Sequence, residues 1–148
     1  MNNYKTLGMT FRVINKTLEH NKNKILESLE LTSSQAGVLI YLLQNQNNEI
    51  NQNNEINQKD IESYLNLKNP TVTGILNRLE IKGFITRVAS DKDARHKKIV
   101  LTNKSKNKCK EIFDEIEIAE KHIIRGMSQK EVDLLSELLA KVINNLQT

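Results

Sequence analysis

Polar side chains that could contact a nucleic acid gather first in a segment that runs from Asn69 to Arg78. Arginine can donate two hydrogen bonds to guanine, and asparagine can pair with adenine through both ends of its amide. Threonine can bond a phosphate or touch a thymine methyl group. A solvated helix face is usually richer in Glu and Lys than this segment. Its candidate DNA contacts are Asn69, Thr71, Thr73, Gly74, Asn77 and Arg78.

A second set of candidate contacts lies in the basic segment that surrounds the loop from Ser90 to His96. An arginine at the tip of a narrow hairpin, as we expect for Arg95, suits a minor groove, whose negative potential is deepest where it is narrow. An acid in such a loop would repel phosphate, so we expect Asp93 to hold the Arg95 guanidinium in a fixed direction. The cations that complete this set are Arg87, Lys92, Lys97 and Lys98.

Gly74 stands in the middle of the predicted helix, where glycine costs roughly 1 kcal/mol relative to alanine. Two interpretations carry equal weight. The missing side chain could let the helix backbone approach the floor of a groove, or the glycine could be tolerated drift.

Positive charge is concentrated around these two segments. Residues 59–110 hold 13 Lys and Arg against 5 acids, a net charge of +8, whereas the rest of the chain carries −4. Such a concentration is typical of a phosphate-binding surface. A merely solvated basic face would have no reason to coincide with a helix and a hairpin.

Sequence patterns predict the elements that position these residues. Apolar spacing from Tyr4 predicts a long opening helix, and a capping box at Thr32–Gln35 begins a second helix that should end near Gln44. Asn57 should cap a short third helix. Asn69 should cap a fourth, with Pro70 as its first residue and Gly83 as its stop. The apolar face of the fourth helix should consist of Val72, Ile75, Leu76 and Leu79.

After these helices, two β-branched runs at residues 84–89 and 97–102 predict a hairpin, and two further helices should follow Asn103 and a capping box at Ser128–Glu131. The expected fold is mainly α with a small β-hairpin wing: a winged helix-turn-helix with N- and C-terminal dimerisation helices. We assign residues 1–30 and 103–148 to a helical dimerisation region and 31–102 to the DNA-binding lobe. The alternative is that the terminal helices fold back on their own domain.

A perfect repeat, NNEINQ, occupies residues 47–52 and 53–58. A tandem duplication explains this polar loop more simply than a function, because doubling a loop costs only about 0.6 kcal/mol in closure entropy. We expect the second copy to keep any structural role, such as a short strand at Glu55–Asn57. The first copy should be a mobile bulge.

The motif Asp93-x-Arg95, followed by Ile99-x-Leu101-Thr102 and preceded by Pro70-Thr71-Val72-Thr73 and Leu79-Glu80-x-Lys82-Gly83-Phe84-Ile85, resembles the MarR family of bacterial transcription regulators. The resemblance runs through nearly the whole chain. It implies a homodimer that binds palindromic double-stranded DNA, usually as a repressor released by a small, often phenolic or lipophilic, effector. It also implies that the helix beginning at Asn69 enters the major groove, and that Arg95, braced by Asp93, enters the minor groove.

Other functions find less support in the sequence. His20, His96 and His122 are scattered and no catalytic triad or metal-ligand spacing occurs, so we expect no enzyme, cofactor or metal site. Cys109 lies on a predicted apolar seam, where a packing role is more common than a redox role. No apolar run approaches a membrane span and no export signal is evident, so we expect a cytoplasmic protein. A winged helix that binds another protein instead of DNA is the alternative function.

Overall fold

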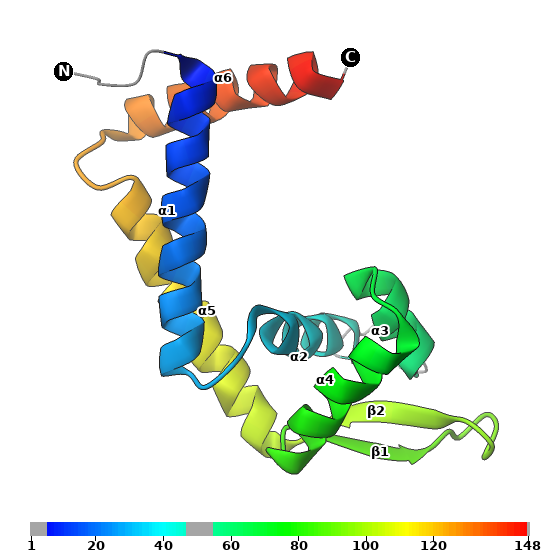
Figure 1. The fold of residues 1–148 in the computed structure, drawn as a ribbon. Coiled ribbons are helices and arrows are strands. Elements are labelled where there is room, and N and C mark those ends of the chain that lie inside the picture. Colours follow the sequence, from blue (N-terminus) through cyan, green and yellow to red (C-terminus); the bar gives the residue numbers. More distant parts are fainter. Residues whose placement is uncertain (1–5, 47–54, 148) are drawn as a thin grey trace. The chain divides into compact units, whose positions relative to one another are not determined.

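The computed structural model describes residues 6–46 and 55–147 (Figure 1). By contacts the chain forms two compact units, Met1–Phe113 and Asp114–Thr148. The boundary falls within the fifth helix, and each unit is described by itself. The helices and strands, in chain order, are α1 (Leu7–Ser28), α2 (Ser33–Gln46), α3 (Gln58–Leu65), α4 (Asn69–Ile81), β1 (Ile85–Ala89), β2 (Lys97–Leu101), α5 (Asn103–Ile123) and α6 (Gln129–Gln147).

Capping interactions explain where α2 and α3 begin. The predicted box at the start of α2 is confirmed, because Thr32 N donates to Gln35 Oε1 at 3.1 Å and Gln35 N donates to Thr32 Oγ1 at 3.2 Å. The predicted cap of α3 is also confirmed. Asn57 Oδ1 accepts from Asp60 N at 3.2 Å, and Asn57 N donates to Asp60 Oδ2 at 2.8 Å. Each box satisfies backbone N–H groups that would otherwise lack partners.

The turn between α3 and α4 gives the helix-turn-helix its tight form. Asn66 adopts the left-handed conformation, with a φ of 51°, and ends α3. Gly83 follows α4 with a φ of 74°, in agreement with its predicted role as a stop signal.

The predicted start of α4 was wrong by one residue. Lys68 occupies the cap position without a side-chain hydrogen bond, and Asn69 is the first helical residue. The Asn69 amide instead bonds two other side chains: Nδ2 donates to Glu62 Oε1 on α3 at 2.8 Å, and Oδ1 accepts from Thr73 Oγ1 at 3.4 Å. Tertiary contact thus decides between two local uses of the same side chain.

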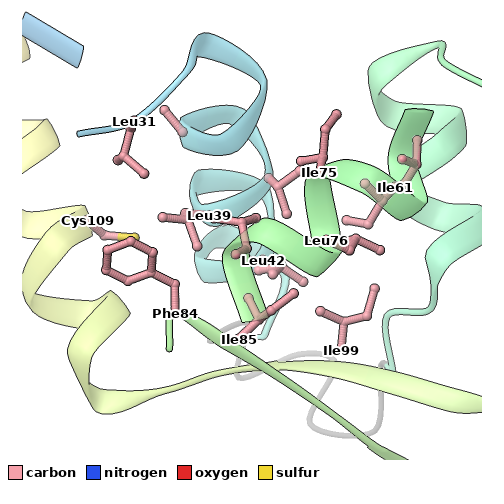
Figure 2. Close-up of a cluster of buried hydrophobic side chains, with 14 of the residues drawn as sticks. Leu31, Leu39, Leu42, Ile61, Ile75, Leu76, Phe84, Ile85, Ile99 and Cys109 are labelled. Carbon is pink, nitrogen blue, oxygen red and sulfur yellow. The ribbon is translucent and has the colours of Figure 1, made fainter. Parts of the chain in front are cut away.

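The predicted apolar face of α4 forms the centre of the core. Val72, Ile75, Leu76 and Leu79 are all buried. Figure 2 shows this face against side chains from α2, α3 and both strands, with Phe84 and Cys109 at one end. The residues that surround it include Leu39, Leu42, Ile61, Ile85 and Ile99.

The two strands form an antiparallel hairpin in which Ile85 pairs with Leu101 and Arg87 pairs with Ile99. The hairpin contacts α4 through β1 and contacts α2 and α3 through β2. The loop closes with a hydrogen bond from Ser90 N to His96 O at 2.9 Å. The predicted hairpin is therefore confirmed, with each strand one residue shorter than expected.

Two predictions around the repeat need correction. Glu55–Asn57 is not a strand, although Ile56 is buried and its carbonyl accepts from Ile99 N at 2.8 Å. The helix expected to end near Gln44 continues to Gln46, because the Gln46 amide donates to Ile99 O at 2.6 Å and so ties α2 to β2. The first copy of the repeat lies outside the described residues.

The last helix presents its apolar residues to the surface. The capping box before α6 is confirmed by Ser128 N donating to Glu131 Oε2 at 2.7 Å and Glu131 N donating to Ser128 Oγ at 3.4 Å. No side chain of α6 is buried. Its exposed large apolar residues are Leu134, Leu135, Leu138, Leu139, Ile143 and Leu146.

The cap of α3 provides a stability test. We expect Asn57→Ala to lower the free energy of unfolding by about 1 kcal/mol, because backbone N–H groups lose their acceptor, and Asn57→Ser to recover most of that loss. Urea denaturation followed by circular dichroism measures the difference. Asn107→Ala, at an exposed position on α5, is the control. Equal midpoints for Asn57→Ala and the control would contradict the role of the cap.

Candidate nucleic-acid interface

The face of α4 opposite the core carries most of the predicted base contacts. Asn77 and Arg78 are exposed, whereas Thr73 and Gly74 are half-buried. Thr71 is exposed in the first turn of the helix. This arrangement follows from the 3.6-residue period of α4, because burial of one stripe leaves the opposite stripe outside.

A polar network fixes the first part of this face. Glu62 Oε1 on α3 accepts from Asn69 Nδ2 at 2.8 Å and from Gln58 Nε2 at 3.2 Å. Gln58 Nε2 also donates to Thr73 Oγ1 at 2.8 Å, and that hydroxyl lies 3.4 Å from Asn69 Oδ1, to which it donates. Asn69 and Thr73 are therefore oriented by α3 before any ligand arrives.

Sequence reasoning missed Gln58 and Glu62 as positioning residues. Their i, i+4 spacing on α3 places them on one face, which a sequence pattern can show. That this face meets the start of α4 follows only from the turn geometry at Asn66.

Arg87 lies against α4. Its Nη2 donates to Asn77 Oδ1 at 2.7 Å, and its Nε lies 3.9 Å from Glu80 Oε2. The side chain is 21% exposed, so Arg87 joins the wing to the exposed face of α4. The predicted contacts Arg87 and Asn77 are thus neighbours in space although ten residues separate them.

The hairpin loop presents Arg95 as predicted. Asp93 accepts from three donors of Arg95: the backbone N at 3.0 Å, Nε at 3.1 Å and Nη2 at 3.0 Å. The hydrogen bond from the guanidinium lowers the pKa of Asp93 and keeps this carboxylate charged. The Arg95 side chain is nevertheless 88% exposed. Asp93 fixes the direction of a guanidinium that still faces solvent.

Glu55, which sequence reasoning considered only as part of a strand, holds the base of this loop. Its carboxylate accepts from the Ser90 hydroxyl and from Asp91 N at 2.7 Å, and it lies 3.6 Å from Lys98 Nζ. The hydrogen bond from Ser90 lowers the pKa of Glu55. This carboxylate therefore stays charged at neutral pH, and the contribution of its contacts is lost only as the pH falls through the lowered pKa.

The four predicted cations of the hairpin have different surroundings. Lys98 is half-buried between Glu55 and Asp91, whose Oδ2 it contacts at 2.5 Å. Lys92 and Lys97 are exposed. The structure thus leaves Lys92 and Lys97 facing solvent with Arg95, while Lys98 and Arg87 have protein partners.

The space around Gly74 decides neither interpretation of this glycine. A Cβ built there would meet its nearest atom, Arg78 Nη1, at 4.0 Å, so nothing in residues 6–46 and 55–147 requires a glycine. Cys109 is fully buried beside Phe84 (Figure 2), and burial raises the pKa of its thiol. A buried thiol with a raised pKa fits packing better than redox chemistry.

Among the described helices, none is both long and apolar enough to span a membrane.

Comparison with known proteins finds similar transcription regulators. Residues 48–97 match the family model described as the MarR family. MepR, a transcription regulator of the Staphylococcus aureus multidrug efflux pump MepA, is 26% identical over 95% of this chain and 98% of its own, with a TM-score of 0.84. A MepR variant from S. aureus bound to an oligodeoxyribonucleotide is 26% identical over 97% of this chain and 99% of its own, with a TM-score of 0.75.

A third structure, the transcription regulator MarR from Oenococcus oeni, is 27% identical over 94% of this chain and 99% of its own, with a TM-score of 0.61. These matches include the helices on both sides of the winged helix-turn-helix as well as the lobe itself. Together with the match of residues 48–97 to the family model, they show that the chain has a winged helix-turn-helix fold similar to that of MarR-family transcription regulators.

Proposed function

We propose that this protein is a sequence-specific regulator that binds double-stranded DNA as a homodimer and represses transcription from a palindromic operator. The observation that carries the proposal is the solvent-facing Arg95 guanidinium, held by two hydrogen bonds that it donates to the Asp93 carboxylate, in the same unit as the exposed polar face of α4. In this proposal α4 reads base edges in the major groove, and Arg95 enters the adjacent minor groove. MepR, whose variant binds an oligodeoxyribonucleotide, supports the assignment by similarity.

The distribution of charge supports DNA over a protein partner. Within the +8 block of residues 59–110, Lys92, Lys97 and Arg95 face solvent around the hairpin. A protein-interaction surface of the same fold would gain little from two exposed lysines beside an arginine held rigidly by an acid. A phosphate-binding surface needs such cations.

The homodimer is supported by the apolar surface of the helices outside the lobe. In α5, Phe113, Ile116 and Ile118 are exposed, and α6 exposes six large apolar side chains. Contiguous exposed apolar faces of this kind usually mark an interface. A twofold dimer would present two lobes to the two halves of a palindrome.

The proposal includes a small effector that changes DNA binding. One depression of about 570 Å³ lies between the end of α1, the start of α2 and the end of α4. Its wall combines Leu26, Leu31 and Ile81 with the charged residues Glu27, Glu30, Arg78 and Lys82. A lipophilic or phenolic ligand bound there would touch Arg78, which is also a candidate DNA contact, so binding could alter the affinity for the operator.

A salt titration separates DNA binding from protein binding. Purified protein incubated with genomic fragments at increasing salt should lose affinity steeply, with a slope of log K against log salt of about −0.9 for each phosphate neutralised. Sequencing the retained fragments identifies the operator. Absence of any retained duplex at low salt would reject the proposed function.

The wing provides a sharper test through a double-mutant cycle. We expect Arg95→Ala to weaken operator binding roughly tenfold, because it removes a minor-groove cation. Asp93→Ala should weaken binding in the wild-type background, because the guanidinium loses its fixed direction. In the Arg95→Ala background, Asp93→Ala should cause no further loss. Gel-shift measurements of the four proteins give the coupling, and equal losses in both backgrounds would rule out a bracing role.

The dimer can be tested on α6. We expect Leu135→Glu combined with Leu139→Glu to give a monomer in analytical ultracentrifugation, because charges would be buried in the proposed interface. Operator affinity should fall at least 100-fold, since one lobe contacts only half of the site. Lys141→Gln, which removes only an exposed ion pair with Glu137, is the control and should remain dimeric. A dimeric double variant would place the interface elsewhere.

A further inference from the structure

The direction of the Arg87 side chain follows from the register of the hairpin. Residues two apart on a strand point to the same face, so Arg87 shares its face of β1 with the buried Ile85. Its partner on β2 is Ile99, which is also buried. Arg87 is therefore a charged residue on the core side of the wing, and its long side chain emerges beside α4.

Two residues of α4 receive the Arg87 guanidinium. Nη2 donates to Asn77 Oδ1 at 2.7 Å, and Glu80 Oε2 lies 3.9 Å from Nε. Asn77 and Glu80 are three residues apart and so lie on one face of the helix. Within the described residues, Nε is buried without a hydrogen-bond partner. The guanidinium is thus held between strand and helix, with Asn77 as its close partner.

This contact fixes which end of the Asn77 amide faces outward. A guanidinium has five N–H donors and no acceptor, so only the amide oxygen of asparagine can face it. The reversed amide would place N–H groups against N–H groups beside a positive charge. Asn77 Nδ2 therefore points away from Arg87, and within the described part of the chain it donates to no protein acceptor.

We propose that Arg87 sets the base preference of Asn77 by presenting its amide as a hydrogen-bond donor, so that Asn77 selects guanine in the major groove. This inference rests on the proposed function, in which α4 enters that groove. Guanine offers two acceptors there, N7 and O6, whereas adenine offers the acceptor N7 and the donor N6 amino group. Pairing of asparagine with adenine through both amide ends requires an oxygen that can accept from N6.

The positive charge of Arg87 strengthens this selection. An adenine amino group that approached Asn77 Oδ1 would bring its own partial positive charge next to the guanidinium. The two electronegative atoms of guanine would instead approach a donor backed by a cation, which makes the hydrogen bond charge-assisted in part. Asparagine in general can pair with adenine, but the orientation of the Asn77 amide favours guanine.

The test begins with selection from a random double-stranded DNA library by the full-length protein at low salt. Comparison of the motifs selected by wild-type protein and by Asn77→Ala identifies the base pair whose preference depends on Asn77. We expect guanine at that position in the wild-type motif. Two duplexes that differ only there, with a G·C or an A·T pair, then give the ratio of the two dissociation constants for each variant.

Three variants separate orientation of the amide from simple loss of charge. The wild-type ratio should favour guanine roughly tenfold or more. Arg87→Met should bring it near one, because Asn77 can then turn its oxygen outward. Asn77→Asp keeps an acceptor for Arg87 but removes both N–H donors, so the preference for guanine over adenine should be lost. Lys97→Met removes an exposed cation of the wing and should weaken binding to both duplexes without changing the ratio.

Circular dichroism melting verifies that the lobe of each variant is folded. Because Asn77 is exposed, Asn77→Asp tests the inference without changing the core. Failure of the wild-type protein to select any duplex would overturn DNA binding and this inference together. A selected motif with adenine at the Asn77-dependent position, a ratio that Arg87→Met leaves unchanged, or an Asn77→Ala motif identical to that of the wild type would overturn the inference alone.

Discussion

Burial of one stripe of α4 is the constraint on which the lobe depends. Val72, Ile75, Leu76 and Leu79 are enclosed by α2, α3 and the hairpin, and each is 6% exposed or less. Full burial of four such side chains stabilises the fold by several kcal/mol, at about 1.5–3 kcal/mol for each. The helix cannot rotate about its axis without exposing these side chains to water. The residues on its other side therefore have a fixed orientation. The candidate base-reading face is a consequence of the core.

Polar contacts then determine what that face and the wing can offer to a ligand. Gln58 and Glu62 orient Asn69 and Thr73, and Arg87 orients Asn77. Glu55 holds the base of the hairpin loop. Side chains that are already oriented by a neighbour lose less conformational entropy on binding than side chains that move freely. Contacts of this kind also engage Arg87 and Lys98 with other residues of the protein. Fewer cations are therefore free to bind phosphate than the net charge of the lobe suggests.

The helices outside the lobe raise a different physical question. They carry apolar residues at helical spacing, yet α6 buries none of them, and α5 buries apolar side chains only near its start, at Cys109 and Ile112. An isolated chain with these surfaces would be prone to association. The proposed homodimer would cover these apolar surfaces with a second copy of the chain.

Local signals in the sequence determined the helices, their caps and the hairpin. Capping boxes at Thr32, Asn57 and Ser128, the apolar period of α4 and the stop at Gly83 all act within a few residues, so they can be read without the fold. The pairing of Asp93 with Arg95 is equally local. The identity of the exposed face of α4 followed from the same periodicity, and so did the candidate contacts Asn77 and Arg78.

Only the tertiary structure decided which of these side chains have partners. Asn69 turns from a cap to Glu62, Gln46 lengthens α2 to reach β2, and Lys98 is held by Glu55, 43 positions earlier in the chain. Arg87 could be recognised from sequence as a cation on a strand, but its contact with Asn77 depends on how the hairpin packs against α4. Caps and helical stripes depend on the spacing of residues along the chain, so they can be predicted from the sequence. Hydrogen bonds between distant segments depend on distances that core packing sets, so they required the tertiary structure.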